Sequence, residues 1–204
     1  MTPYYEDEAV IIYHGDAREI VPPPGCVLVS DPPYPNNAGH FSDGIQAAVE
    51  YLEDFCGVHA LVFWDVLARP SLSLPLVAVH VWHRTNTNRP NNFEPVYEYH
   101  ADGVRRSSRV MRHAVIAEGL TGCFEATGHP TQKNVRLMSE LIRRTDEAAT
   151  VLDPFMGSGT TLRAAKDLGR KAIGIEIDER YCEIAARRMA QGVLDFGPAV
   201  VGQD

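Results

Sequence analysis

The sequence predicts an α/β fold with a mostly parallel sheet, an antiparallel strand pair and helices on both faces. Short β-branched apolar runs alternate with segments of helical periodicity, which is typical of strand–helix–strand units. Two of these runs, at 27–30 and 151–152, lead directly into an aspartate and a rigid or glycine-rich turn. In an open parallel sheet, such a turn marks the carboxyl end of a strand, where ligands bind.

Eight apolar runs have the length and the Val, Ile and aromatic content of strands. They are Val10–Tyr13, Val27–Ser30, Ala60–Trp64, Leu76–Trp82, Val96–Tyr99, Val115–Ala117, Val151–Leu152 and Ala172–Ile177.

Helical periodicity occurs in four segments, at 45–56, 135–144, 158–168 and 181–189. We expect Asp178 to cap the last helix at its N-terminus and Gly169 to end the helix before it. The stretch from Thr85 to Gly128 breaks the alternation, because it is rich in Asn and Arg and has no clear helix. A strand pair with an inserted loop region is predicted there.

Length and composition indicate one soluble domain. The chain has 204 residues, 45% hydrophobic and 23% charged, which suits a single core. It has no apolar run long enough to span a membrane, and Met1–Glu8 lacks a signal pattern, so we expect a cytoplasmic protein. The four cysteines stand singly, so neither a zinc site nor a disulfide framework is predicted.

The charge is unevenly distributed. The net charge of −8 argues against a nucleic-acid partner, yet residues 84–113 carry six arginines against three acidic residues. This asymmetry favours a local surface for a polyanion, and a solvated charged loop explains it equally well. The six arginines are Arg84, Arg89, Arg105, Arg106, Arg109 and Arg112.

The second turn is a glycine-rich loop, Asp153–Gly159, between a strand and a helix. Gly157 and Gly159 have no side chains to keep a ligand from the backbone, and Ser158 or Thr160 can cap the helix. This arrangement predicts a nucleotide-type binding loop. A tight turn without a ligand is the alternative.

The class of nucleotide follows from what this loop lacks. A dinucleotide fingerprint needs a third small residue where this chain has Leu162, and the Gly-Lys-Ser/Thr run of a P-loop is absent. Glu176, at the end of the next strand, is placed to bind ribose hydroxyls. The combination favours an adenosyl ligand without phosphates, and S-adenosyl-L-methionine fits.

The first turn, Asp31-Pro32-Pro33-Tyr34, has the features of a base pocket. Its two prolines remove backbone donors and leave carbonyls free, Asp31 adds an acceptor, and Tyr34 adds a flat ring. Acceptors beside an aromatic platform match an exocyclic amino group on a planar base. A simple turn is the alternative.

Together these motifs resemble the amino-methyltransferases of DNA, which methylate adenine at N6 or cytosine at N4. Asp31–Tyr34 is similar to their catalytic D-P-P-Y motif, Asp153–Gly159 to their F-x-G-x-G cofactor motif, and His129–Lys133 to a third motif. Their order resembles the permuted β-type arrangement of the family. Gly15-Asp16 matches a weaker motif, and Asn134 departs from the proline that is usual in the family.

The resemblance implies residue roles. Asp31 and the Pro32 carbonyl accept the amino hydrogens, and Tyr34 stacks on the flipped base. Pro33 completes the four-residue motif Asp31–Tyr34, called the tetrad below. The six arginines contact DNA. The implied cofactor-binding residues are Asp16, Thr131, Gln132, Lys133, Asp153, Phe155, Gly157, Ser158, Gly159, Thr160 and Glu176, with Thr131–Lys133 closing over the methionine portion.

The resemblance also implies one Rossmann-like methyltransferase domain. We expect a catalytic half at 1–98, a target-recognition-like segment at 99–128, a cofactor-binding half at 129–192 and an irregular tail at 193–204. Because the recognition segment is so short, sequence selectivity is expected to be short, relaxed or shared with a second subunit. A homodimer is therefore expected.

The implied reaction is site-specific methyl transfer from S-adenosyl-L-methionine to N6 of adenine in double-stranded DNA, without a metal, in restriction–modification. The leading aspartate favours adenine, since cytosine-N4 enzymes more often begin the tetrad with serine. Cytosine-N4 methylation, RNA or glutamine-amide substrates, and a non-catalytic adenosyl- or nucleic-acid-binding module remain alternatives. Cytosine-C5 methylation is disfavoured, because no cysteine follows a proline.

Overall fold

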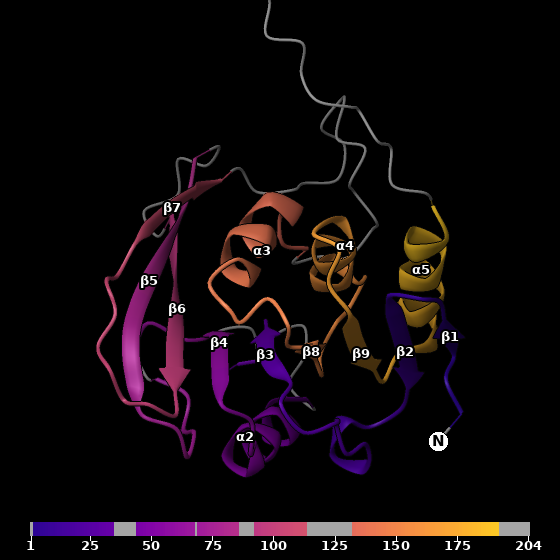
Figure 1. Ribbon diagram of the computed structural model, residues 1–204, viewed down its shortest axis with the longest axis horizontal. Coiled ribbons are helices and arrows are strands. Elements are labelled where there is room, and N and C mark those ends of the chain that lie inside the picture. The colour runs from indigo at the N-terminus through magenta and orange to yellow at the C-terminus, as the bar shows by residue number, and fades with distance from the viewer. Residues whose placement is uncertain (1, 35–43, 68, 86–91, 114–131, 192–204) are drawn as a thin grey trace, which may run out of the picture.

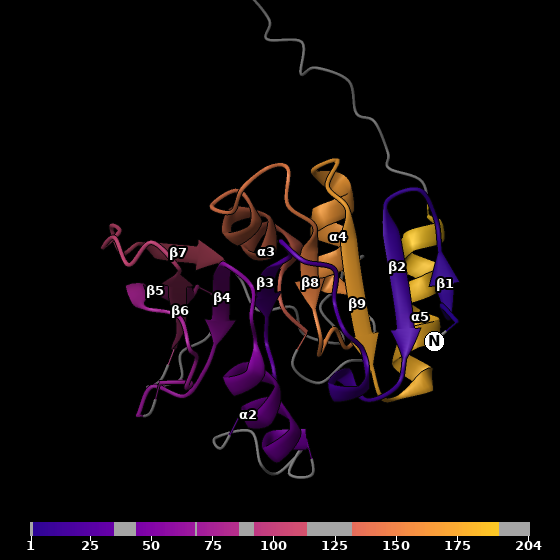
Figure 2. The ribbon, with the colours of Figure 1, turned by 60° about the horizontal axis from the view of Figure 1, so that its bottom comes forward.

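The computed structural model describes residues 2–34, 44–67, 69–85, 92–113 and 132–191. Within these ranges a nine-stranded sheet has the order β1-β2-β9-β8-β3-β4-β6-β5-β7 (Figures 1 and 2). The strands are β1 (Tyr5–Glu6), β2 (Val10–His14), β3 (Val27–Ser30), β4 (His59–Phe63), β5 (Leu76–Arg84), β6 (Phe93–His100), β7 (Val110–His113), β8 (Val151–Asp153) and β9 (Ala172–Glu176).

The centre of the sheet is parallel, as predicted. Strands β2, β9, β8, β3 and β4 pair in parallel with one another in this order, and β7 pairs in parallel with β5. Strand β6 runs antiparallel to both β4 and β5, and β1 runs antiparallel to β2. Because β6 opposes β4, its first residues lie beside the carboxyl end of β4.

Helices cover both faces of the sheet (Figures 1 and 2). One face carries α3 (Val135–Ile142), α4 (Thr160–Asp167) and α5 (Glu179–Ala190), and the other carries the 3-10 turn η1 (Ala17–Glu19) and α2 (Ile45–Asp54). None of the helices in the described ranges is long and apolar enough to cross a membrane.

The core consists of two apolar clusters, one on each face of the sheet. In β3, Val27 and Val29 belong to the cluster under α3, α4 and α5, while Leu28 belongs to the cluster over α2. All four residues of β3 and all five of β4 are buried. Burial on both faces explains why these strands are continuous apolar runs rather than alternating ones.

The predicted elements in the described ranges are confirmed with shifted ends. Strand β6 begins at Phe93, three residues before the predicted start, and α2 ends at Asp54 rather than at Cys56. The predicted strand Val115–Ala117 lies outside the described residues. The sequence did not predict β1, η1 and β7, which are short and carry few core residues. Strand β7 lies at the edge of the sheet.

The helix ends differ in one respect from the prediction. Asp178 caps α5 by accepting from the Arg180 N–H at 2.9 Å, and Gly169, at φ +69°, follows the C-cap of α4, both as expected. The predicted cap of α4 by Ser158 or Thr160 is wrong. Its N-cap is Gly159, at φ +77°, without a side-chain hydrogen bond, because that left-handed turn sets the start of the helix.

Candidate active site

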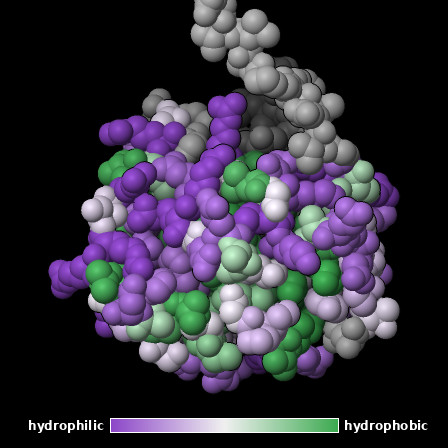
Figure 3. Space-filling model, in the orientation of Figure 1, coloured by the Kyte–Doolittle hydropathy of each residue, from purple (hydrophilic) through white to green (hydrophobic). Residues whose placement is uncertain are grey.

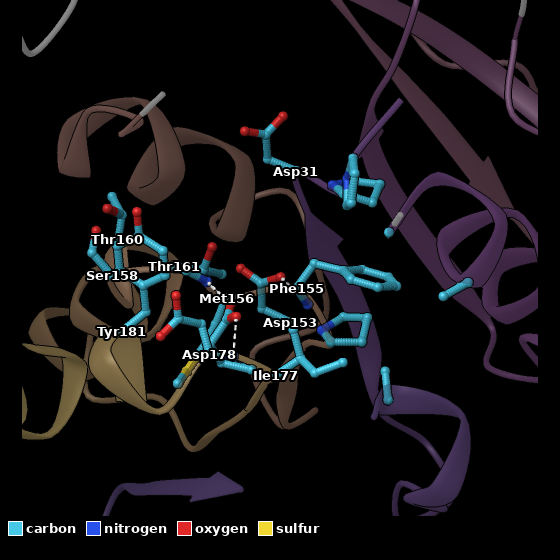
Figure 4. A pocket seen from close by; sticks show the side chains of 18 of the residues that line it. Asp31, Asp153, Phe155, Met156, Ser158, Thr160, Thr161, Ile177, Asp178 and Tyr181 are labelled. Atoms are coloured by element: carbon cyan, nitrogen blue, oxygen red, sulfur yellow. Dashed lines mark hydrogen bonds between the residues drawn. The ribbon is translucent and has the colours of Figure 1, made fainter. Parts of the chain in front are cut away.

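Three neighbouring parallel strands end in acidic residues. Asp31 follows β3, Asp153 ends β8, and Glu176 ends β9. Because these strands are parallel, the three carboxyl groups lie at the same edge of the sheet. A cavity of about 550 Å³ opens there and is lined by all three. Figure 4 shows Asp31 at one side of this cavity, apart from Ser158, Thr160 and Tyr181.

Most of the predicted site residues line this cavity. They are Asp16, Asp31, Pro32, Pro33, Gln132, Lys133, Asp153, Phe155, Gly157, Ser158, Thr160 and Glu176. Tyr34 and Gly159 do not line it, and Thr131 lies outside the described residues. The two predicted halves therefore meet in one cavity.

Glu176 holds the glycine loop in place. Its Oε2 accepts from the Gly157 N–H at 2.9 Å and its Oε1 accepts from the Asp178 N–H at 2.9 Å. Burial raises the pKa of Glu176 against these hydrogen bonds, which favour its charged form. The carboxylate thus joins the end of β9 to the loop, and it also lines the cavity.

The two loop glycines have different functions. Gly157, at φ +50°, lines the cavity. Gly159 faces away from it, and a Cβ there would lie 2.8 Å from the Cβ of Ala185 on α5. Glycine at 159 therefore permits close packing of the loop on α5, in addition to the left-handed turn.

Asp153 joins the ends of β3 and β8. Its Oδ1 accepts from the Ser30 hydroxyl at 2.6 Å and from the Phe155 N–H at 3.2 Å. Burial raises the pKa of Asp153 to about 6, against the hydrogen bonds from Ser30 and Thr161. The carboxyl group orients the start of the glycine loop from inside the core, as Figure 4 shows beside Phe155.

Lys133 points toward Asp31. Its Nζ donates to Asp31 Oδ2 at 2.5 Å and lies 3.4 Å from Glu94 Oε2 on β6. The same ammonium lies 4.8 Å from the ring centre of Phe63 and 5.7 Å from that of Trp82. The sequence did not single out Glu94, because no motif includes it and the pairing of β6 with β4 and β5 brings it here.

The charges of Lys133, Asp31 and Glu94 shift the pKa values of Lys133 and Asp31. Burial alone lowers the pKa of Lys133, but the attraction of Asp31 and Glu94 outweighs it and raises that pKa. Burial also raises the pKa of Asp31, and the nearby Lys133 charge opposes this effect. Lys133 is therefore a protonated cation between two carboxyl groups.

Tyr34 lies in the core rather than in the cavity. Its side chain is buried, with the residue 5% exposed, and its ring centre lies 5.9 Å from that of Trp64, at an interplanar angle of 44°. The residues that follow it, 35–43, are outside the described ranges. Its stacking on a base stays a prediction.

The cavity is also lined by residues that the sequence motifs did not predict as site residues, among them Arg18, Ile177, Asp178, Arg180 and Tyr181. Arg18 binds the Asp16 carboxylate through Nη2 at 2.6 Å and Glu50 on α2 through Nη1 at 2.5 Å. Ile177 is 70% exposed directly after β9. An apolar residue directly after a strand-end acid was the signal available in the sequence.

The predicted DNA-contacting arginines divide into two groups. Arg84 pairs with Glu94 at 3.4 Å, and Arg106 pairs with Asp102 at 2.9 Å. The exposed group on or before β7 is Arg105, Arg109 and Arg112, while Arg89 lies outside the described residues. Figure 3 shows that hydrophilic residues cover most of the visible face, including the side formed by β5–β7.

Sequence comparison gives one family match and several relatives. The DNA methylase family model N6_N4_Mtase matches residues 74–187. The Type II methyltransferase M2.DpnII of Streptococcus pneumoniae is 31% identical over 180 residues, 85% of this chain and 63% of the relative. M2.LlaDCHI of Lactococcus lactis subsp. cremoris, also a Type II methyltransferase, is 48% identical over 115 residues, 55% of this chain and 41% of the relative. The chain thus spans less than two thirds of the length of these relatives.

Solved structures share the fold. The M1.HpyAVI–SAM complex superposes with a TM-score of 0.67 at 23% identity, covering 89% of this chain and 100% of that structure. The PvuII DNA methyltransferase, described as cytosine-N4-specific, superposes with a TM-score of 0.68 at 17% identity, covering 93% and 89%. At these identities the likeness concerns the arrangement of strands and helices.

Proposed function

Because the chain belongs to the N6/N4 DNA methylase family, we propose that it transfers a methyl group from S-adenosyl-L-methionine to an exocyclic amino group of a DNA base. One observation carries this proposal. A single cavity of about 550 Å³ has the Asp31–Pro33 acceptors at one end and the glycine loop with Glu176 at the other. An amino substrate and a methyl donor can therefore meet within it.

The residues around the glycine loop fit this cofactor. Glu176 and Asp178 offer carboxylates for ribose hydroxyls, and Phe155 and the exposed Ile177 offer apolar surfaces for an adenine ring. Gly157 brings backbone to the cavity without a side chain. We propose that Thr131, Gln132 and the loop hold the methionine end. When bound, the cofactor supplies an activated sulfonium methyl group.

The tetrad would act on the amino nitrogen, whose lone pair is delocalised into the base. Asp31 and the Pro32 carbonyl accept its two hydrogens, which returns electron density to the nitrogen. The glycine loop and Glu176 would hold the cofactor so that its sulfonium could supply the methyl group to this nitrogen, with the sulfur keeping the bonding electron pair. The methylated nitrogen then loses a proton to Asp31, and from there to solvent. Positioning of this kind contributes up to roughly 7–11 kcal/mol.

We propose adenine N6 as the target. The leading Asp31 of the tetrad supports it, because serine more often leads the tetrad in cytosine-N4 enzymes. Cytosine N4 is the second candidate, favoured by the likeness to the PvuII enzyme described as cytosine-N4-specific. In either case the base must leave the duplex before it reaches Asp31, at a cost of a few kcal/mol.

The test is methylation of unmethylated double-stranded DNA with labelled cofactor, followed by mass spectrometry of the nucleosides. Wild type and Asp54→Ala, which alters an exposed acid outside the cavity, are expected to give N6-methyladenine, and Asp31→Ala background signal. Label at cytosine N4 overturns the choice of base. Label only in RNA or protein overturns the substrate class.

We also propose that the protein works in the cytoplasm as part of a restriction–modification system, since the two relatives described above are Type II methyltransferases. We propose in addition that it acts as a homodimer. The short segment at 99–128 gives one copy little surface for recognising DNA. Light scattering on the purified chain with and without DNA tests the dimer, and a monomeric mass in both conditions contradicts it.

A further inference from the structure

One cation and two acids form a compact cluster beside the tetrad. Lys133 Nζ lies 2.5 Å from Asp31 Oδ2 and 3.4 Å from Glu94 Oε2. The three residues come from three separate segments: the end of β3, the start of β6 and the residues before α3. The Lys133 side chain is 6% exposed, and those of Glu94 and Asp31 are 17% and 18% exposed.

Aromatic rings enclose the cation. The Nζ of Lys133 lies within 6 Å of the ring centres of Phe63 on β4 and Trp82 on β5, a favourable position for an ammonium group. On the other side of Glu94, Arg84 Nη1 lies 3.4 Å from Oε1. The order Asp31–Lys133–Glu94–Arg84 alternates in charge, which stabilises each group against the cost of its burial.

Burial favours the neutral form of the Asp31 carboxyl group, whereas the proposed reaction needs the ionised carboxylate. Burial raises the pKa of Asp31, and the negative charge of Glu94 adds to this, while the positive charge of Lys133 lowers it. Asp153 faces the same group from β8, and Tyr34 faces Lys133 from the tetrad. Of these groups, Lys133 is the cation in contact with Asp31.

We propose that Lys133 and Glu94 are positioning residues for Asp31: Lys133 holds its carboxyl group ionised, and Glu94 fixes Lys133 from the opposite side. The inference rests on the proposed function, because an amino group donates to an ionised carboxylate, whereas a neutral carboxyl presents an O–H against the N–H. It differs from the role implied by resemblance, in which Lys133 closes over the methionine portion.

The two oxygens of the Asp31 carboxyl group differ in their hydrogen bonds, and both belong to a largely buried side chain. Lys133 occupies Oδ2, whereas Oδ1 has no hydrogen-bond partner among the described residues. An amino group that reaches Oδ1 would therefore find an acceptor there while the ion pair of Asp31 with Lys133 persists. Glu94 Oε2 likewise has no hydrogen-bond partner in the described ranges, so it contacts Lys133 through charge rather than through a hydrogen bond.

The test measures the titration of the Asp31 carboxyl by ¹³C NMR in the free protein, with its signal assigned by its loss in Asp31→Asn. In Lys133→Met the midpoint is expected to rise by about 1–3 pH units, because a neighbouring positive charge is lost. In Glu94→Gln it is expected to fall, because the nearby negative charge that favours the protonated form of Asp31 is lost. Glu53→Gln, at an exposed position of α2, is the matched control and leaves the midpoint unchanged.

Opposite shifts in the two variants support the proposal, and unchanged midpoints or shifts in one direction overturn it. Circular dichroism shows that each variant is folded, and if Lys133→Met is unfolded, Glu94→Gln still decides by the direction of its shift. The acid limb of the pH profile of kcat/KM is expected to move in the same directions as the midpoints. Activity that is lowered in both variants without movement of that limb contradicts the proposal. The titration needs no methyl transfer, so an inactive wild type would refute the proposed function and leave this test intact.

Discussion

Gly159 shows how a residue predicted from a ligand motif can also be required by packing. Its φ of +77° and the 2.8 Å distance from an added Cβ to the Ala185 Cβ restrict this position to glycine. The glycine pattern predicted the loop correctly. It could not reveal the contact with α5, because that contact depends on how two elements pack.

Gly159→Ala is therefore expected to destabilise the fold more than Gly25→Ala. Both positions have φ near +80°, so both substitutions carry the backbone cost of about 1–2 kcal/mol. Only position 159 adds a steric clash, since nothing lies within 4 Å of a Cβ at Gly25. Urea denaturation of both variants measures the difference, and equal losses would show that α5 moves aside freely.

Asp153 predicts a pH dependence of stability. Its pKa is about 6 in the folded protein and 3.8 in its ordinary state, so the folded state binds the proton more tightly. This contribution to the free energy of unfolding is complete below about pH 4 and is lost as pH rises through 6, by up to about 3 kcal/mol. Compared with Asp153→Asn, wild type is expected to lose stability over this pH range in urea titrations. A stability difference that does not vary with pH would contradict the assignment.

Among the elements, the buried strands were the most predictable from sequence. Strand β3 matches its predicted bounds and β4 is shifted by one residue, because burial on both faces leaves uninterrupted apolar runs. Strand β7 was missed, because it has four residues and only its edge pairing with β5 makes it a strand. Local sequence does not contain that information.

Helix α3 begins at a residue that departs from the resembled family. Asn134 has an extended conformation, and its side chain accepts from the Arg136 N–H at 2.8 Å. Asparagine thus starts the helix by capping, where proline would do so by restricting φ.

Replacement of this cap is expected to cost stability. Asn134→Ala should lower the free energy of unfolding by about 0.5–2 kcal/mol, because the Arg136 N–H loses its acceptor. Asn134→Asp keeps an acceptor oxygen and is the matched control. Thermal unfolding of the two variants measures the effect, and equal melting temperatures would mean that the cap contributes nothing.

At the scale of the molecule, the sequence predicted that the two motifs share one sheet edge, and one cavity joins them. It did not predict the burial of Tyr34 or the contact of Lys133 with Asp31. Both depend on strands β4, β5 and β6, whose neighbours are set by the antiparallel course of β6 rather than by any motif.

The exposed arginines on and before β7 lead to a prediction about DNA. Arg105→Ala, Arg109→Ala and Arg112→Ala are each expected to weaken DNA binding and to flatten its salt dependence by about one phosphate contact. Arg106, paired with Asp102, is expected to matter less. Arg187→Ala, at an exposed position on α5, is the control. Binding isotherms at several salt concentrations measure the slopes, and unchanged slopes in all three variants would return these arginines to a solvated surface.

The reversed direction of β6 has a consequence for how this protein can evolve. The Asp31 end of the cavity lies at the exit of β3, where Glu94 at the start of β6 contacts the lining residue Lys133, whereas the glycine-loop end lies at the exits of β8 and β9. Substitutions that alter substrate preference can therefore accumulate in one stretch of the chain and leave the other unchanged. Under the proposed methyl transfer, selection could adjust the target base without disturbing the residues proposed to hold the methyl donor.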